Sequence, residues 1–128
     1  MKKKRTVAVL DTNFLLLPYQ FKIDILRELD EIITGYEPVI STTIYDELKK
    51  LSKKKGKHGM AAKFAIKIVD ANKVKKIKTK TGADDWVVEY CGKTGAVACT
   101  NDIKLKKKLK SKKIKVIGLK SKSRLGFL

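Results

Sequence analysis

The chain has 128 residues, of which 31 are Lys or Arg and 13 are Asp or Glu, so its formal net charge at pH 7 is +18. This length predicts one domain with its own core, without disulfides or a structural metal. Two cysteines, Cys91 and Cys99, are too few for a secreted disulfide framework and lack the spacing of a zinc ribbon, so we expect them to be reduced. The first apolar run is too short for a signal peptide or a membrane span, which predicts a cytoplasmic protein.

The excess of positive charge favours an anionic partner, because a surface network of ion pairs would need both signs in similar number. Basic residues gather at 2–5, 53–57, 104–113 and 120–124. Such a charge predicts salt-sensitive binding to nucleic acid, since each neutralised phosphate releases counterions. Aromatic residues make up only 7% of the chain, so stacking on bases is not expected to be the main mode of binding.

Hydrophobic periodicity in the N-terminal half predicts strands that alternate with helices. Residues 6–10 form an apolar run ended by Asp11, as expected for a strand buried on both faces. Residues 14–17 continue apolar until Pro18 breaks the run. The next predicted elements are a helix at 23–33 ended by Gly35, a strand at 39–40, a helix capped at 41–43 that carries Glu47, a small-residue helix at 61–69 and a strand at 74–77.

The same alternation continues in the C-terminal half. Asp84 and Asp85 open a predicted helix that ends near Gly92, and residues 96–99 form the fourth strand. Residues 100–102 begin a lysine-rich helix, and residues 114–119 form the fifth strand. The pattern predicts an α/β fold, a three-layer α/β/α sandwich with a central, mainly parallel five-stranded sheet, as one domain over residues 1–128.

The segment from about residue 120 is predicted to be a basic tail of this domain. Its lysines could extend a path for nucleic acid. We expect Leu125 and Phe127 to dock on the core, in preference to serving as a partner-binding peptide.

Acidic side chains stand where the predicted strands end or the following helices begin. They are Asp11, Glu47, Asp84, Asp85 and Asp102. In parallel sheets, functional sites form at the carboxyl ends of the strands, where the topology reverses. Several carboxylates in one small space repel each other unless a cation neutralises them, and oxygen ligands suit Mg²⁺ or Mn²⁺ better than zinc.

Each acid also has an ordinary structural interpretation. Asp11 could form an Asx turn or a cap, Asp84 or Asp85 could cap a helix, and so could Asp102. Glu47 fits an exposed helix position. The lone His58 fits a loop better than a general base.

Four ordered motifs resemble those of PIN-domain nucleases over almost the whole chain. They are residues 9–13 (VLDTN), 43–48 (TIYDEL), 83–88 (ADDWVV) and 100–102 (TND). The chain looks most similar to small archaeal PIN proteins that stand between VapC-type toxins and the PIN nucleases of small-subunit ribosomal RNA processing. The resemblance implies an endoribonuclease that depends on Mg²⁺ or Mn²⁺ and cuts single strands.

The resemblance also assigns roles to the acids. Asp11 and Asp85 match the principal metal ligands, Glu47 the second acid and Asp102 the fourth. Asp85 is preferred to Asp84 because it directly precedes the apolar run at 86–88, as the family's aspartate usually does, and Asp84 remains a competitor.

Polar residues beside the acids match positions that in the family help to hold them. These are Thr12, Asn13 and Thr100, for which simple turn chemistry is the alternative. Metal-activated water would leave a 5′-phosphate and a 3′-hydroxyl. Candidate contacts to the RNA backbone are Lys53, Lys54, Lys55 and Lys57.

Alternative functions are a signalling receiver domain and a non-catalytic RNA-binding or scaffold protein. The first is disfavoured because the first strand offers Asp11 instead of an acidic pair and because the chain is so basic. Expected partners are RNA, an antitoxin or a ribosome-assembly protein, and a second copy in a homodimer. The motifs do not separate a toxin from a processing enzyme, and we favour a ribonuclease of unassigned pathway.

Overall fold

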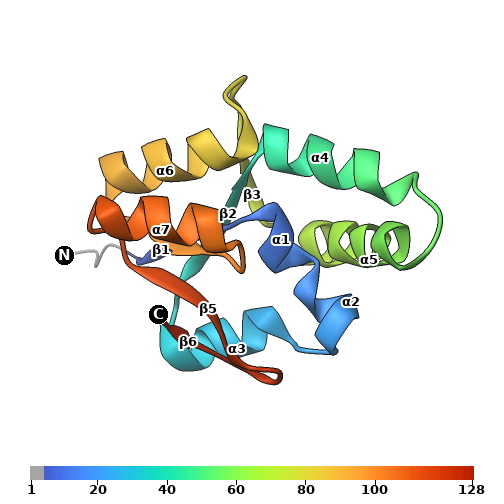
Figure 1. Cartoon of the computed structure of the whole chain (residues 1–128), viewed down its shortest axis with the longest axis horizontal. Helices are drawn as coiled ribbons and strands as arrows, with labels where there is room; N and C mark the ends of the chain where they lie inside the picture. Colours follow the sequence, from blue (N-terminus) through green and yellow to red (C-terminus); the bar gives the residue numbers. More distant parts are fainter. Residues whose placement is uncertain (1–4) are drawn as a thin grey trace.

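The computed structural model describes residues 5–128, so the basic cluster predicted at residues 2–5 lies outside the described part apart from Arg5. A six-stranded sheet in the order β3-β2-β1-β4-β5-β6 forms its centre (Figure 1). The elements in chain order are β1 (Val7–Leu10), α1 (Thr12–Leu15), α2 (Leu17–Phe21), α3 (Ile25–Ile32), β2 (Glu37–Ser41), α4 (Thr42–Ser52), α5 (Lys57–Ala71), β3 (Lys75–Ile77), α6 (Ala83–Thr94), β4 (Val97–Cys99), α7 (Ile103–Ser111), β5 (Val116–Ser121) and β6 (Arg124–Phe127).

Strand β1 lies in the middle of the sheet and pairs in parallel with both β2 and β4. Its last three residues, Ala8, Val9 and Leu10, have no exposed surface, which explains why the strand reads as one apolar run. The chain leaves β1 towards β2 and β3, and it then returns to the other side of β1 as β4. The strand order therefore reverses between β1 and β4.

Helices cover the sheet on two sides. Figure 1 shows α6 and α7 on one side of the strands, with α4 and α5 on the other. This arrangement confirms the predicted three-layer α/β fold. Within residues 5–128, we find no helix with the length and apolar character needed to span a bilayer.

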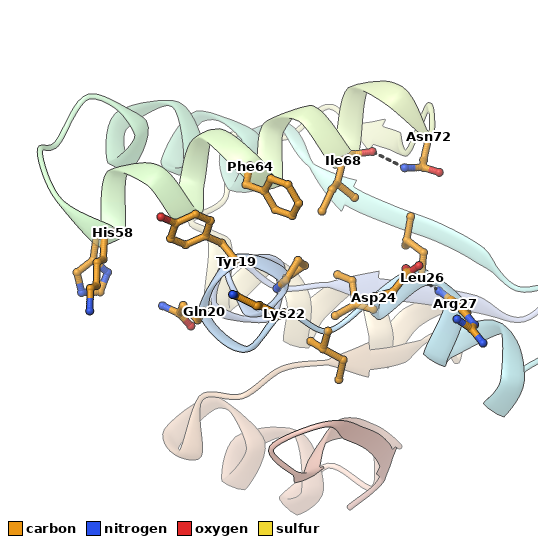
Figure 2. A pocket seen from close by; sticks show the side chains of 14 residues that line it. Tyr19, Gln20, Lys22, Asp24, Leu26, Arg27, His58, Phe64, Ile68 and Asn72 are labelled. Carbon is orange, nitrogen blue, oxygen red and sulfur yellow. Dashed lines mark hydrogen bonds between the residues drawn. The ribbon is translucent and has the colours of Figure 1, made fainter.

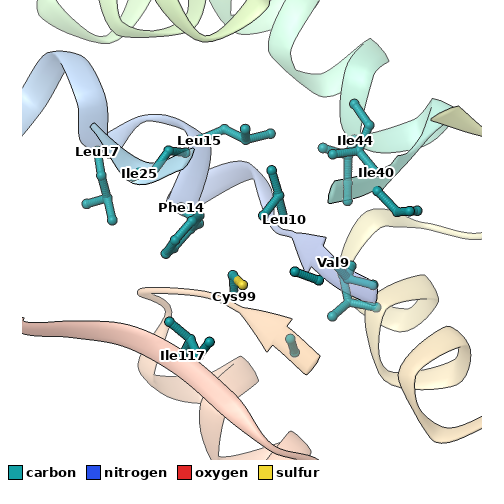
Figure 3. Close-up of a cluster of buried hydrophobic side chains, with 14 of the residues drawn as sticks. Val9, Leu10, Phe14, Leu15, Leu17, Ile25, Ile40, Ile44, Cys99 and Ile117 are labelled. Atoms are coloured by element: carbon teal, nitrogen blue, oxygen red, sulfur yellow. The ribbon is translucent and has the colours of Figure 1, made fainter. Parts of the chain in front are cut away.

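The core contains large side chains from several elements (Figure 3). Leu10, Phe14, Ile40, Ile44 and Ile117 are all fully buried. Each contributes about 1.5–3 kcal/mol through removal of apolar surface from water.

Both cysteines belong to this core as free thiols. Burial raises the pKa of Cys91 to about 12 and that of Cys99 well above its usual value. Both thiols therefore stay protonated and unreactive at neutral pH.

Two short helices occupy the stretch in which the sequence predicted no element. Helices α1 and α2 follow β1, and Pro18 lies in the first turn of α2, where its missing N–H costs no hydrogen bond. The predicted helix at 23–33 begins later than expected, because Asp24 caps α3 by accepting a hydrogen bond from the Arg27 N–H at 3.2 Å. His58, predicted to lie in a loop, is in the first turn of α5.

The predicted C-terminal tail is instead a sixth strand. Strand β6 pairs antiparallel with β5, and Leu119 faces Leu125 in the register. Leu125 is 7% exposed and docks as expected, whereas Phe127 is 44% exposed. The basic residues around the turn conceal the strand pattern, and only the pairing with β5 reveals it.

Gly118 on β5 lies against the residue that follows β4. A Cβ atom at this position would lie 2.6 Å from the carbonyl oxygen of Thr100 and 2.7 Å from a methyl group of Leu128. Both distances are too short for real contacts, and the first involves backbone. The close approach of β5 to the end of β4 therefore requires glycine here.

Replacing Leu125 with alanine should lower the free energy of unfolding by about 2 kcal/mol, because the side chain is buried against the core. The matched control, Phe127→Ala, removes a larger but half-exposed side chain and should cost less than about 1 kcal/mol. Urea denaturation followed by circular dichroism measures both. Equal, small losses would indicate a tail that is not part of the sheet.

Candidate active site

A polar pocket of about 520 Å³ gathers all five predicted acids. They come from four places: the end of β1, the middle of α4, the first turn of α6 and the start of α7. The lining residues are Asp11, Thr12, Asn13, Glu47, Gly82, Ala83, Asp84, Asp85, Asp102 and Lys108. The pocket therefore lies where the strand order reverses, at the carboxyl ends of β1 and β4.

The backbone ladder of the sheet fixes Asp11 at the floor of this pocket. Its N–H donates to the carbonyl of Cys99 at 3.0 Å, and the N–H of Thr100 donates to the carbonyl of Ile117 at 3.0 Å. These bonds continue the pairing one residue past β1 and β4, so the side chains of Asp11 and Thr100 meet. The Thr100 hydroxyl donates to Oδ2 of Asp11 at 2.5 Å.

Asp11 is only 2% exposed, and its electrostatic state reflects this burial. Desolvation, with smaller contributions from the charges of Asp84 and Asp102, raises its pKa from 3.8 to about 6, against the lowering effect of the bonds from Thr100 and the Thr12 backbone. A carboxylate in this environment would be stabilised by a cation.

Asp102 has a structural task and also faces the pocket. Its Oδ1 caps α7 by accepting from the Leu105 N–H at 3.0 Å, as the capping interpretation predicted. Its Oδ2 accepts from the Asn13 side chain at 3.3 Å, and its N–H donates to the Thr100 hydroxyl at 3.0 Å. Asp11, Thr100, Asp102 and Asn13 thus form one connected network.

Asp84 and Asp85 do not cap α6 as one interpretation predicted. The N-cap is Gly82, which has no side-chain cap, and both aspartates lie in the first turn. The pKa of Asp84 is raised by burial first and then by the charges of Asp102, Glu47 and Asp85, against the lowering effect of Lys108. Asp84 is therefore electrostatically coupled to acids on α4 and α7.

Asp85 has a different environment from Asp84. Its side chain is 76% exposed, and its Oδ1 lies 3.9 Å from Nζ of Lys108. It lines the pocket, but a lysine partly neutralises its charge.

The chemistry of the lining fits a hard divalent cation. The donors are carboxylate and hydroxyl oxygens, and the buried hydroxyl of Thr12 has no hydrogen-bond partner within the described residues 5–128. Within residues 5–128, no three acidic, histidine or cysteine side chains form a preassembled metal-binding group. A hard cation such as Mg²⁺ needs no preassembled group of this kind, because it keeps several waters and uses only one or two carboxylates directly.

The predicted RNA-contact lysines lie elsewhere. Lys53, Lys54 and Lys55 follow the end of α4 and Lys57 begins α5, at a connection that Figure 1 shows on the side away from α6 and α7. None of these four lysines lines the acidic pocket. The lysine that does line it is Lys108 on α7. The sequence shows Lys108 as one of many in a basic helix, and nothing in that pattern marks it out.

A separate groove of about 1340 Å³ lies between α2, α3 and α5 (Figure 2). Apolar side chains, including Tyr19, Leu26, Phe64 and Ile68, share its lining with basic ones such as Arg27. The groove shares no lining residue with the acidic pocket.

Comparison with known proteins assigns the family. The sequence model of a family described as "PIN like domain" matches residues 8–122. The chain belongs to this PIN-domain family. The resemblance inferred from the four motifs is thereby confirmed.

Individual relatives of this PIN domain agree with the assignment. Ribonuclease VapC9 of Archaeoglobus fulgidus is 35% identical over 120 residues, covering 92% of this chain and 86% of the relative. The structure of the PIN domain endonuclease Utp24 superposes with a TM-score of 0.79 at 25% identity, covering 95% of this chain and 92% of the other. The VapBC-1 structure from nontypeable Haemophilus influenzae has a TM-score of 0.58 at 15% identity, covering 83% and 94%, and shares the fold.

The raised pKa of Asp11 predicts a pH-dependent stability. Between pH 3.8 and about 6, Asp11 stays protonated in the folded protein but is ionised in the unfolded chain. The stability that protonated Asp11 contributes is therefore complete below pH 3.8 and is lost as the pH rises through about 6. Asp11→Asn should therefore raise the free energy of unfolding at pH 7 by roughly 1–3 kcal/mol in EDTA, and the gain should shrink towards zero near pH 4. Urea titrations at both pH values measure this difference. A gain that is equal at the two pH values would attribute it to packing of the amide.

Proposed function

We propose that this PIN-domain protein is a divalent-metal-dependent endoribonuclease that hydrolyses RNA phosphodiester bonds. The observation that carries the proposal is the convergence of five carboxylates on one pocket in a chain with a net charge of +18. The acids account for a metal, and the basic surface accounts for a polyanionic substrate. The 35% identical relative, Ribonuclease VapC9, supports RNA as that substrate.

Within this proposal, Asp11, Glu47, Asp84 and Asp102 are the acids that would hold the metal. The comparison of motifs favoured Asp85 over Asp84 as a metal ligand. The coupling of Asp84 to Glu47 and Asp102, and the contact of Asp85 with Lys108, now favour Asp84. Mg²⁺ and Mn²⁺ are the candidate ions.

The chain's own residues prepare the site for chemistry. Thr100 holds Asp11 in one orientation, and Asn13 and the α7 backbone do the same for Asp102. A bound Mg²⁺ or Mn²⁺ would lower the pKa of an attacking water and stabilise charge on the leaving oxygen. Hydrolysis of this kind leaves a 5′-phosphate and a 3′-hydroxyl.

The biological pathway is part of the proposal only in outline. The motif resemblance keeps both a VapC-type toxin and a processing nuclease as candidates, and the similar proteins include Ribonuclease VapC9 and the PIN domain endonuclease Utp24. A toxin should be inhibited by the product of a neighbouring gene, whereas a processing enzyme should prefer a ribosomal RNA precursor and need no inhibitor. A cytoplasmic location and a homodimer stay predictions.

An antitoxin, if there is one, would find a suitable surface in the groove between α2, α3 and α5. The apolar floor of the groove and its basic rim, with Lys22, Arg27 and Lys57, fit an acidic peptide that has an apolar face. A second copy of this chain fits this groove less well, because the rim of the groove and the chain as a whole carry charge of the same sign.

Asp11→Asn should abolish RNA cleavage and largely preserve RNA binding, because the substitution removes a metal-facing charge and leaves the basic surface intact. End-labelled single-stranded and hairpin RNAs are incubated with Mg²⁺, Mn²⁺ or EDTA, and we expect metal-dependent cuts that the variant reduces by about 100-fold or more. Unchanged cleavage by the variant would refute the site. Salt-sensitive binding without any cuts would support the non-catalytic RNA-binding alternative instead.

The two neighbouring aspartates offer a matched comparison. Asp84→Asn should reduce cleavage at least about tenfold more than Asp85→Asn, because Asp84 is coupled to the acids of α4 and α7. Single-turnover rates with the same RNA measure both variants. The opposite order would restore Asp85 as the ligand that the motif comparison favours.

A further inference from the structure

Among the residues that the structure describes, one cationic side chain lines the acidic pocket, and this is Lys108. Its Nζ lies 3.9 Å from Oδ1 of Asp85, and the side chains are 65% and 76% exposed. An exposed pair at this distance contributes at most about 1 kcal/mol to stability. The contact with Asp85 therefore does not explain why a lysine belongs in the pocket, and Lys108 can leave Asp85 readily.

Charge balance suggests what Lys108 does there. Five carboxylates line the pocket, and one divalent cation neutralises only part of their charge. A phosphodiester that enters the pocket is itself an anion, so it meets net repulsion from the acids. Lys108 offsets part of the acids' charge, because it pairs with Asp85 and lowers the pKa of Asp84, and its ammonium group is also favourable towards an approaching phosphate.

The fold holds Lys108 at a defined place. Asp102 caps the start of α7, and Leu105 and Leu109 are buried on either side of Lys108 in the sequence, which fixes the rotation of the helix. Lys107, the preceding residue, is exposed and does not line the pocket. The helix therefore presents one lysine of its basic run to the acids.

We propose that Lys108 is a catalytic residue of the nuclease site, which leaves Asp85 and binds the scissile phosphate through its non-bridging oxygens. The proposal rests on the proposed function, because it assigns to Lys108 a contact with the substrate of that same site. The ammonium group offsets the repulsion between the acids and the phosphate and stabilises the charge that grows on the phosphate oxygens during hydrolysis.

The test compares Lys108→Ala and Lys108→Arg with the matched control Lys107→Ala. Single-turnover cleavage of a labelled single-stranded RNA is measured with Mn²⁺ at saturating protein, and the affinity for Mn²⁺ alone is measured by calorimetry. Lys108→Ala should lower the cleavage rate at least about tenfold while Mn²⁺ binds equally well or more tightly. Lys108→Arg should retain part of the rate, and Lys107→Ala should change it less than about threefold.

Two results would overturn the proposal. One is a rate for Lys108→Ala equal to that of Lys107→Ala. The other is a weaker Mn²⁺ affinity that accounts for the whole loss of rate, since Lys108 would then organise the acids and not the RNA.

RNA affinity in Ca²⁺ and in EDTA separates this proposal from the proposed function. If the wild-type protein cuts no RNA, the proposed function fails. The role of Lys108 is then tested by how much Ca²⁺ increases the affinity for RNA relative to EDTA. Loss of this gain in Lys108→Ala but not in Lys107→Ala supports the phosphate contact. A gain that both variants keep, or no gain in the wild-type protein, refutes it.

Discussion

A carboxylate buried at the end of the central strand governs the arrangement of the site. Asp11 is placed there by the same ladder of backbone hydrogen bonds that joins β1 to β4, so its position follows from the sheet itself. Burial is unfavourable for the charged form, and the Thr100 hydroxyl offsets only part of this cost. Thr100 in turn accepts a hydrogen bond from the Asp102 backbone, so strand, loop and helix meet at one hydroxyl group.

The molecule concentrates five of its thirteen acidic residues in one pocket. Acids gather at the point where the strand order reverses, whereas lysines cover much of the remaining surface. Without a cation, the acids repel each other and make the site a region of local instability. The same repulsion would favour the proposed divalent metal, because such an ion carries two positive charges. Repulsion between the acids and the proposed affinity for a metal are therefore two consequences of one arrangement.

The sequence predicted the alternating strands and helices well, because buried parallel strands read as apolar runs and helices show their own period. It also located the acids, since carboxyl ends of parallel strands share one edge of the sheet. The sequence could not show whether Asp84 or Asp85 faces the other acids. Adjacent residues on a helix point about 100° apart, and the rotation of α6 depends on its packing. Lys108 was missed for a similar reason: its neighbours in α7 are also lysines, and only the packing of α7 near α6 selects it. Strand β6 was missed because its pattern is brief and basic, and its partner lies in β5.

Gly118 shows that a residue without a functional group can be as restricted as an acid of the site. Its missing side chain leaves room for the Thr100 carbonyl and for Leu128, so a larger residue would displace the threonine that orients Asp11. Any larger amino acid at this position would therefore disturb the site, although the glycine itself contributes no ligand, proton or charge. A search for functional positions that considers only side-chain chemistry would pass over it.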